Sequence, residues 1–110
     1  MTKELTLFGY PIRCRLTRLD DGIHVLLTGG QKSHIGAIST AEPGSPAQTV
    51  TFPGHKDQYI SAPWAEALAK AAGVRCCTVC GIHYDNATPE QIHTILTETD
   101  RLLAEIISRL

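Results

Sequence analysis

The run from Val74 to Ile82 constrains the fold more than any other stretch of the sequence. It is almost wholly apolar, and it lies between two segments whose apolar residues have helical spacing. A strand that is apolar on both faces belongs in the interior of a sheet, where both faces are covered. We therefore expect an interior strand here, with a second layer of structure packed on its sheet.

The same run contains Cys77-Thr78-Val79-Cys80, a spacing that also occurs in redox and zinc sites. Side chains three residues apart on a strand point to opposite faces, so Cys77 and Cys80 are expected on opposite sides of the sheet. Redox pairs of this spacing gain reactivity at a helix N-terminus, and no helix is expected to start here. Buried structural cysteines are the favoured interpretation, and a metal or redox role is the alternative.

Four strand-like segments precede this run. They cover residues 5–16, with a bend at 9–11, and then residues 23–29, 35–40 and 48–52. Asp21-Gly22 is a hairpin signal between the first two segments. These segments alternate in polarity or end at turn-forming residues, which is typical of half-buried strands.

Two helices complete the predicted fold. Ser61 is expected to cap the first, with Pro63 in its first turn and Gly73 just beyond its end. Thr88-Pro89-Glu90-Gln91 matches a capping box at the start of the second, which runs towards Leu110. The predicted order is ββββαβα. It indicates a single α+β domain over residues 1–110, a two-layer sandwich with a mainly antiparallel sheet and both helices on one face.

Charge and hydropathy exclude several classes of function. A net charge of −1 argues against a nucleic-acid binder that works by bulk charge. No stretch approaches the ~20 apolar residues of a membrane span, and the N-terminus lacks a signal peptide, so we expect a cytoplasmic protein with reduced cysteines. A homodimer is expected, because the second face of the sheet needs a cover.

Three loops that follow strand-like runs each combine glycine with histidine, and we expect them to converge on one polar site. Glycine lets another molecule approach the backbone closely, and backbone N–H groups with lysine can hold a small anion. The candidate cofactor-binding residues are Gly29, Gly30, Lys32, Ser33, His34, Gly36, His55, Lys56, His83, Asp85 and Asn86.

The histidines His34, His55 and His83 are also candidate metal ligands, since three imidazoles are a common ligand count. They can instead bind a phosphate or an aromatic ring, or be three unrelated loop residues. The sequence contains no nucleophile motif, Walker loop or dinucleotide fingerprint. It therefore indicates a binding site more readily than a catalytic one.

The three loops carry a resemblance to a known family. Gly29-Gly30 with Ser33-His34-Ile35-Gly36-Ala37, then Phe52-Pro53-Gly54-His55-Lys56, then Gly81-Ile82-His83-Tyr84-Asp85-Asn86-Ala87-Thr88 resemble the prenylated-flavin chaperone family. Its LpdD-like members are regarded as accessory components of gallate decarboxylase. One departure is Ser33, where a proline is expected.

The resemblance implies a non-catalytic accessory protein that binds prenylated FMN and assists its maturation in, or delivery to, a UbiD-type decarboxylase. Two alternatives stay open. One is a small metal-dependent enzyme that uses His34, His55 and His83 with a divalent ion, and Asp85 as a base. The other is a purely structural subunit of a decarboxylase complex.

Overall fold

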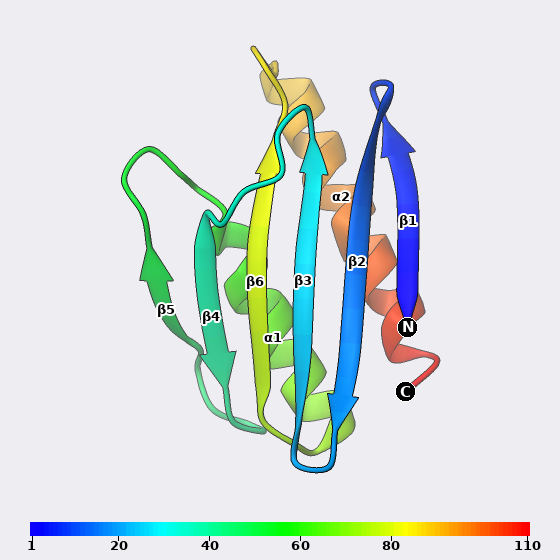
Figure 1. Cartoon of the computed structure of the whole chain (residues 1–110), viewed down its shortest axis with the longest axis vertical. Coiled ribbons are helices and arrows are strands. Elements are labelled where there is room, and N and C mark those ends of the chain that lie inside the picture. Colours follow the sequence, from blue (N-terminus) through cyan, green and yellow to red (C-terminus); the bar gives the residue numbers. More distant parts are fainter.

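The computed structural model describes residues 1–110 as six strands and two helices (Figure 1). In chain order these are β1 (Thr2–Leu7), β2 (Tyr10–Leu19), β3 (Gly22–Gly30), β4 (Ala37–Ala41), β5 (Gln48–Thr51), α1 (Gln58–Ala72), β6 (Cys76–His83) and α2 (Pro89–Ile107). The strands form one sheet in the order β1-β2-β3-β6-β4-β5, and both helices cover the same face of it. Only β3 and β6 pair in parallel, so the predicted α+β class with a mainly antiparallel sheet is confirmed.

The interior position predicted for the apolar run is also confirmed. β6 lies between β3 and β4 in the sheet. Cys76, Thr78 and Cys80 are buried on one face of β6, whereas Cys77 and Val79 are half-buried on the other. Cys77 and Cys80 therefore point to opposite faces as predicted, and all four cysteines are free thiols.

The first strand of the prediction is a hairpin, so the order is βββββαβα and not ββββαβα. Leu7 pairs with Tyr10, which leaves Phe8 and Gly9 as the turn. Both have positive φ, 53° and 83°, as tight hairpin turns that follow the sheet twist require. Gly9 signals such a turn, but Phe8 does not. Its ring contacts Tyr84 edge-on at a centroid distance of 5.7 Å, a contact that no local pattern reveals.

The core lies between the sheet and the helices. Alternate residues of β2 and β3 meet the inner sides of α1 and α2 there, and the largest members are Ile12, Val25, Leu27, Trp64, Leu68 and Ile106. Each large apolar side chain that leaves water stabilises the fold by about 1.5–3 kcal/mol. This packing fixes both helices so that they start towards the end of the sheet where β3 and β6 end (Figure 1).

The start of α1 differs from the prediction. Asp57 and not Ser61 is the N-cap residue, and Pro63 lies inside the helix. Ser61 is buried, with its Oγ 2.7 Å from Ser39 Oγ of β4. The Ser-x-Pro pattern has the local character of a helix start, whereas the partner hydroxyl on β4 can be known only from the fold. The predicted end is confirmed, because Gly73 closes the helix with a left-handed φ of 70°.

The start of α2 agrees with the prediction. Thr88 Oγ1 accepts the Gln91 N–H at 3.1 Å, and Gln91 Oε1 accepts the Thr88 N–H at 2.9 Å. This reciprocal pair is the predicted capping box. It fixes the first turn of α2 close to the end of β6.

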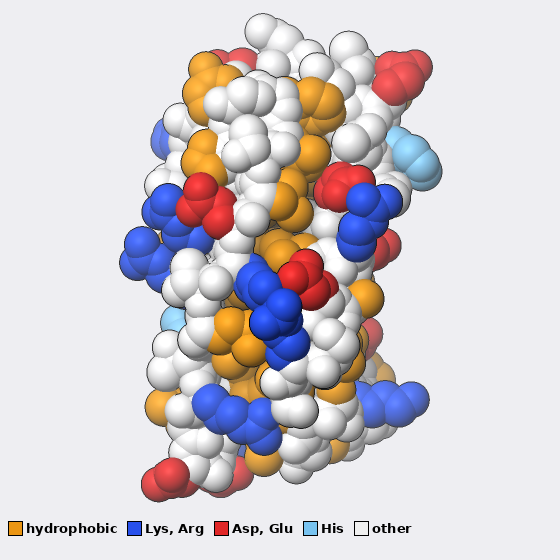
Figure 2. Space-filling model, turned by 90° about the vertical axis from the view of Figure 1, so that its right-hand side faces the viewer, with side chains coloured by type: hydrophobic (Ala, Val, Ile, Leu, Met, Phe, Trp, Pro, Cys, Tyr) orange, Lys and Arg blue, Asp and Glu red, His pale blue; other side chains and the backbone are white.

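The face of the sheet that the helices leave open carries a continuous apolar row. The strand register places Leu26, Val79, Ile38 and Val50 side by side across β3, β6, β4 and β5. Figure 2 looks onto the β1 edge and shows Lys and Arg side chains on the open-face side, with hydrophobic atoms running between β1 and the helix layer. No helix combines the length and apolar character that a membrane span needs.

Candidate functional site

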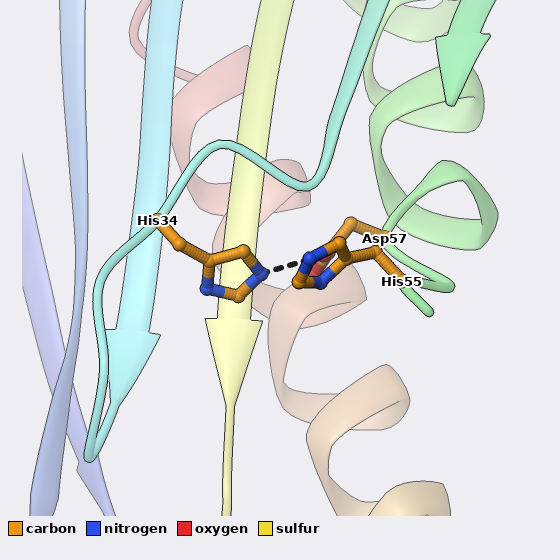
Figure 3. Close-up of side chains that lie close together, drawn as sticks. All are labelled: His34, His55 and Asp57. Carbon is orange, nitrogen blue, oxygen red and sulfur yellow. Dashed lines mark hydrogen bonds and ion pairs between the residues drawn. The ribbon is translucent and has the colours of Figure 1, made fainter. Parts of the chain in front are cut away.

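The loop 31–36, which joins β3 to β4, has to cross β6 because β6 lies between those two strands. It crosses at Gly81, where a Cβ would overlap the His34 carbonyl oxygen. At the end of the loop, Gly36 donates its N–H to the Cys80 carbonyl at 2.9 Å. Only glycine allows backbones to approach this closely. The crossing carries His34 over the end of β6 (Figure 3).

His34 is held at both ring nitrogens. Nδ1 lies 3.1 Å from the Lys32 carbonyl oxygen, and Nε2 lies 3.0 Å from Asp57 Oδ2 (Figure 3). Since a carbonyl only accepts, Nδ1 carries a hydrogen and donates it. The side chains of His34 and Asp57 are 11% and 6% exposed. The pair is therefore largely removed from water. A polar interaction in such a buried environment is stronger than one at the surface.

Asp57 is the central residue of the site, and the sequence did not place it among the candidate binding or metal-ligating residues. Its Oδ1 accepts the Ile82 N–H at 2.9 Å and lies 3.8 Å from the Cys80 sulfur. Burial raises the pKa of the Cys80 thiol, and the charge of Asp57 raises it further, so Cys80 stays a thiol and donates. A signal was present, because aspartate is favoured directly before a helix. The side chain does not cap α1, however, and is directed to β6.

The loops bring the three predicted histidines into one cluster. The ring centroids of His34 and His55 are 4.6 Å apart, and His83 lies edge-on to His34 at 6.5 Å. His83 Nε2 is 2.7 Å from Asp85 Oδ1 at the exposed side of the cluster. The potential metal-ligating atoms that all lie within 4.8 Å of one another belong to His34, His55 and Asp57. The predicted ligand set included His83 in place of Asp57.

A hollow of ≈ 470 Å³ opens beside this cluster. Its wall is mainly apolar and comes from α1, β6, the segment after β6 and α2, with Tyr59, Ile60, Ile82, Tyr84, Ile92 and Leu96 as the larger contributors. His55, Lys56 and His83 supply its basic groups. Another hollow, of ≈ 440 Å³, shares no residue with it and contains the Arg75–Glu42 ion pair.

Five further residues that the sequence predicted as binding residues lie outside the histidine cluster and do not line the hollow. Lys32, Ser33 and Asn86 are exposed on their loops. Gly29 and Gly30 end β3, where a Cβ would meet Ile12 and the His83 carbonyl respectively, so these two glycines allow close strand packing.

Gln31, which the sequence analysis did not single out, ties two of the loops together. Its side-chain oxygen accepts the Asp85 N–H at 3.1 Å, and its own N–H donates to the His83 carbonyl at 2.8 Å. These bonds fix the start of the crossing loop against the segment that follows β6.

Comparison with known proteins gives two findings. Residues 6–110 match the sequence profile of the family described as "Prenylated flavin chaperone LpdD-like domain". The chain is also 32% identical over 105 residues to Protein LpdD of Lactiplantibacillus plantarum, a match that covers 91% of this chain and 77% of that protein. Both matches include the crossing loop, the 52–57 turn and the end of β6.

Proposed function

Because the chain belongs to the family of prenylated flavin chaperone LpdD-like domains, we propose that it binds prenylated FMN and assists a UbiD-type decarboxylase. It holds the cofactor for maturation in, or delivery to, that enzyme. It does not itself catalyse decarboxylation. The partner is proposed from the family relationship, and the binding site from the geometry of the chain.

The hollow beside the histidine cluster is the observation that carries this proposal. Prenylated FMN combines a large apolar ring system with a phosphate dianion, and the hollow combines an apolar wall with basic groups. Its volume falls within the range of about 300–1,000 Å³ that is usual for small-molecule sites. Ile82 and Ile92 would cover the ring, and Lys56 with His55 would meet the phosphate.

The positions of the helices favour an anion at this hollow. Tyr59 lies in the first turn of α1 and Ile92 lies in the first turn of α2, and both line the hollow. The N-terminal end of a helix carries a partial positive charge that favours phosphate. Two helix starts and a lysine therefore act in the same direction.

The thiols of this chain support a binding role over a nucleophilic one. Burial raises the pKa of Cys76, Cys77 and Cys80, which keeps them as thiols, whereas a reactive cysteine needs a lowered pKa. A carrier also has to release its cofactor. The basic residues His55 and Lys56 are exposed to solvent, which is compatible with release.

Co-expression with a flavin prenyltransferase tests the proposal. We expect the purified chain to carry prenylated FMN, seen by absorption and mass spectrometry. Calorimetry should show that Lys56→Gln and His55→Gln weaken binding about ten- to a hundredfold, since each loses a charge-assisted hydrogen bond worth about 1.5–3 kcal/mol. Lys70→Gln, in the last turn of α1, is the matched control and should bind as the parent does.

Two outcomes would contradict parts of this proposal. If the parent binds neither prenylated FMN nor FMN, the chaperone function fails. If Lys56→Gln and His55→Gln bind as tightly as Lys70→Gln, the hollow is the wrong site. Partner binding that is indifferent to the flavin would favour the purely structural subunit.

A further inference from the structure

We propose that His34, His55 and Asp57 form a binding site for one divalent first-row transition-metal ion, such as Zn²⁺ or Co²⁺. Their potential ligand atoms all lie within 4.8 Å of one another. An ion that sits about 2.1 Å from each of three ligands holds those atoms about 3–4 Å apart. The side chains thus need only small movements to close around a cation.

Backbone groups already orient two of these ligands. His34 donates Nδ1–H to the Lys32 carbonyl at 3.1 Å, which leaves Nε2, the nitrogen that faces Asp57, to coordinate a cation. Asp57 Oδ1 is occupied by the Ile82 N–H at 2.9 Å, which leaves Oδ2 as the coordinating oxygen. Metal-binding histidines and carboxylates commonly depend on such outer hydrogen bonds.

Gly36 keeps space open at the two facing atoms. A Cβ at this position would overlap Asp57 Oδ2 and would lie 2.9 Å from His34 Nε2. Any residue with a side chain would therefore intrude on the coordinating atoms, whereas glycine leaves them accessible. This feature is independent of the spacing of the three ligands and points to the same place.

The ligand set determines the class of ion. Two imidazoles and one carboxylate suit Zn²⁺, Fe²⁺ and Co²⁺ and leave coordination positions open, whereas Mg²⁺ and Ca²⁺ prefer oxygen ligands alone. His55 and Asp57 also line the hollow, so an open position would face a molecule held there. Since metal ligands bind in their deprotonated form, a bound cation would take the place of any hydrogen between His34 Nε2 and Asp57 Oδ2.

Calorimetry of the chelator-treated chain, without any flavin, tests this site. We expect one Zn²⁺ or Co²⁺ per chain, a visible absorption band for Co²⁺, and no comparable binding of Mg²⁺. Asp57→Asn and His55→Gln should each weaken binding by at least about tenfold, because a ligand contributes no less than an outer hydrogen-bond partner. His93→Gln, an exposed position on α2, should bind as the parent does.

His55 is exposed on a loop, so His55→Gln keeps the test valid even if Asp57→Asn fails to fold. The proposal is overturned if the parent binds no stoichiometric cation, if His55→Gln binds as tightly as His93→Gln, or if Mg²⁺ binds equally well. Loss of binding in His83→Gln equal to that in His55→Gln would also overturn this ligand set. Since no flavin is present, these outcomes are separate from the failure of the cofactor proposal.

Discussion

Cys14 illustrates at the scale of one residue how burial changes chemistry. It lies in the core at 1% exposure. Burial raises the pKa of its thiol from the ordinary 9.0 to about 12, against a smaller lowering by the N-terminal charge. Ionisation of this thiol in the folded chain is therefore unfavourable well into the alkaline range, and Cys14 behaves as an apolar residue.

We predict that the free energy of unfolding falls as the pH rises from 9 towards 12. In this window the unfolded chain releases the Cys14 proton while the folded chain keeps it, so the rise in pH favours unfolding. The loss in the free energy of unfolding that comes from this one thiol approaches about 1.4 kcal/mol per pH unit. Urea unfolding at pH 8, 9 and 10 should show a shallower decline for Cys14→Ala than for the parent. Equal declines would contradict the assignment.

Asp57 also shows what sequence reasoning omits at this scale. The histidine of each loop could be singled out because its residue type and the glycines beside it are visible in the sequence. The role of Asp57 could not be recognised in the same way, because it depends on Ile82 and Cys80. These residues follow 25 and 23 positions later in the chain. A side chain that joins segments so far apart has no local pattern.

At the scale of elements, α2 forms one wall of the hollow, and its capping box sets where that wall begins. Ile92 and Leu96 project from its first turns and are 49% and 37% exposed. Apolar residues at helical spacing usually face the core, whereas these two are exposed and line the hollow. The stability of the helix start is thus tied to the shape of the site.

We predict that Thr88→Ala destabilises the fold by about 1 kcal/mol, because the Gln91 N–H loses its acceptor. Thr94→Ala is the control, since its hydroxyl donates to the Glu90 carbonyl within the helix and leaves no N–H unpaired when removed. Urea unfolding of both variants measures the difference. If Thr94→Ala costs as much as Thr88→Ala, the capping box does not determine the stability of this end.

The elements that could be predicted are those whose signals are local. Thr88-Pro89-Glu90-Gln91 contains the whole capping box, and Gly73 alone marks the end of α1. The start of α1 and the first hairpin were wrong because they depend on distant partners: Ser39 for Ser61, and Tyr84 for Phe8. The strand order, with β6 inserted between β3 and β4, has no sequence signal either.

At the scale of the whole molecule, the open face of the sheet is asymmetric in character. Leu26, Val79, Ile38 and Val50 form an apolar row across four strands, and the register continues that row to Arg15 on β2. Val50, on the edge strand β5, is 56% exposed. A second copy of the chain is the cover that we expect for this row, with two-fold symmetry as in most homodimers.

We predict that the chain is a homodimer in solution and that Val50→Lys shifts it towards the monomer, because a charge would have to be buried in the apolar row. Thr51→Lys, a neighbouring exposed residue on the other face of β5, should leave the dimer intact. Light scattering at micromolar concentration measures both. A monomeric parent would refute the dimer, and equal behaviour of the two variants would place the contact elsewhere.

The crossing of β6 by the loop 31–36 has a consequence in time. During synthesis, β3, the loop and β4 emerge well before β6, yet the strand has to enter between them and lie against His34 at Gly81. His34 and His55 are therefore present in a nascent chain that still lacks the Ile82 N–H that holds Asp57. We expect the site to assemble late in folding, since such non-local strand pairing is slow. An incomplete chain would then be unable to capture a ligand prematurely.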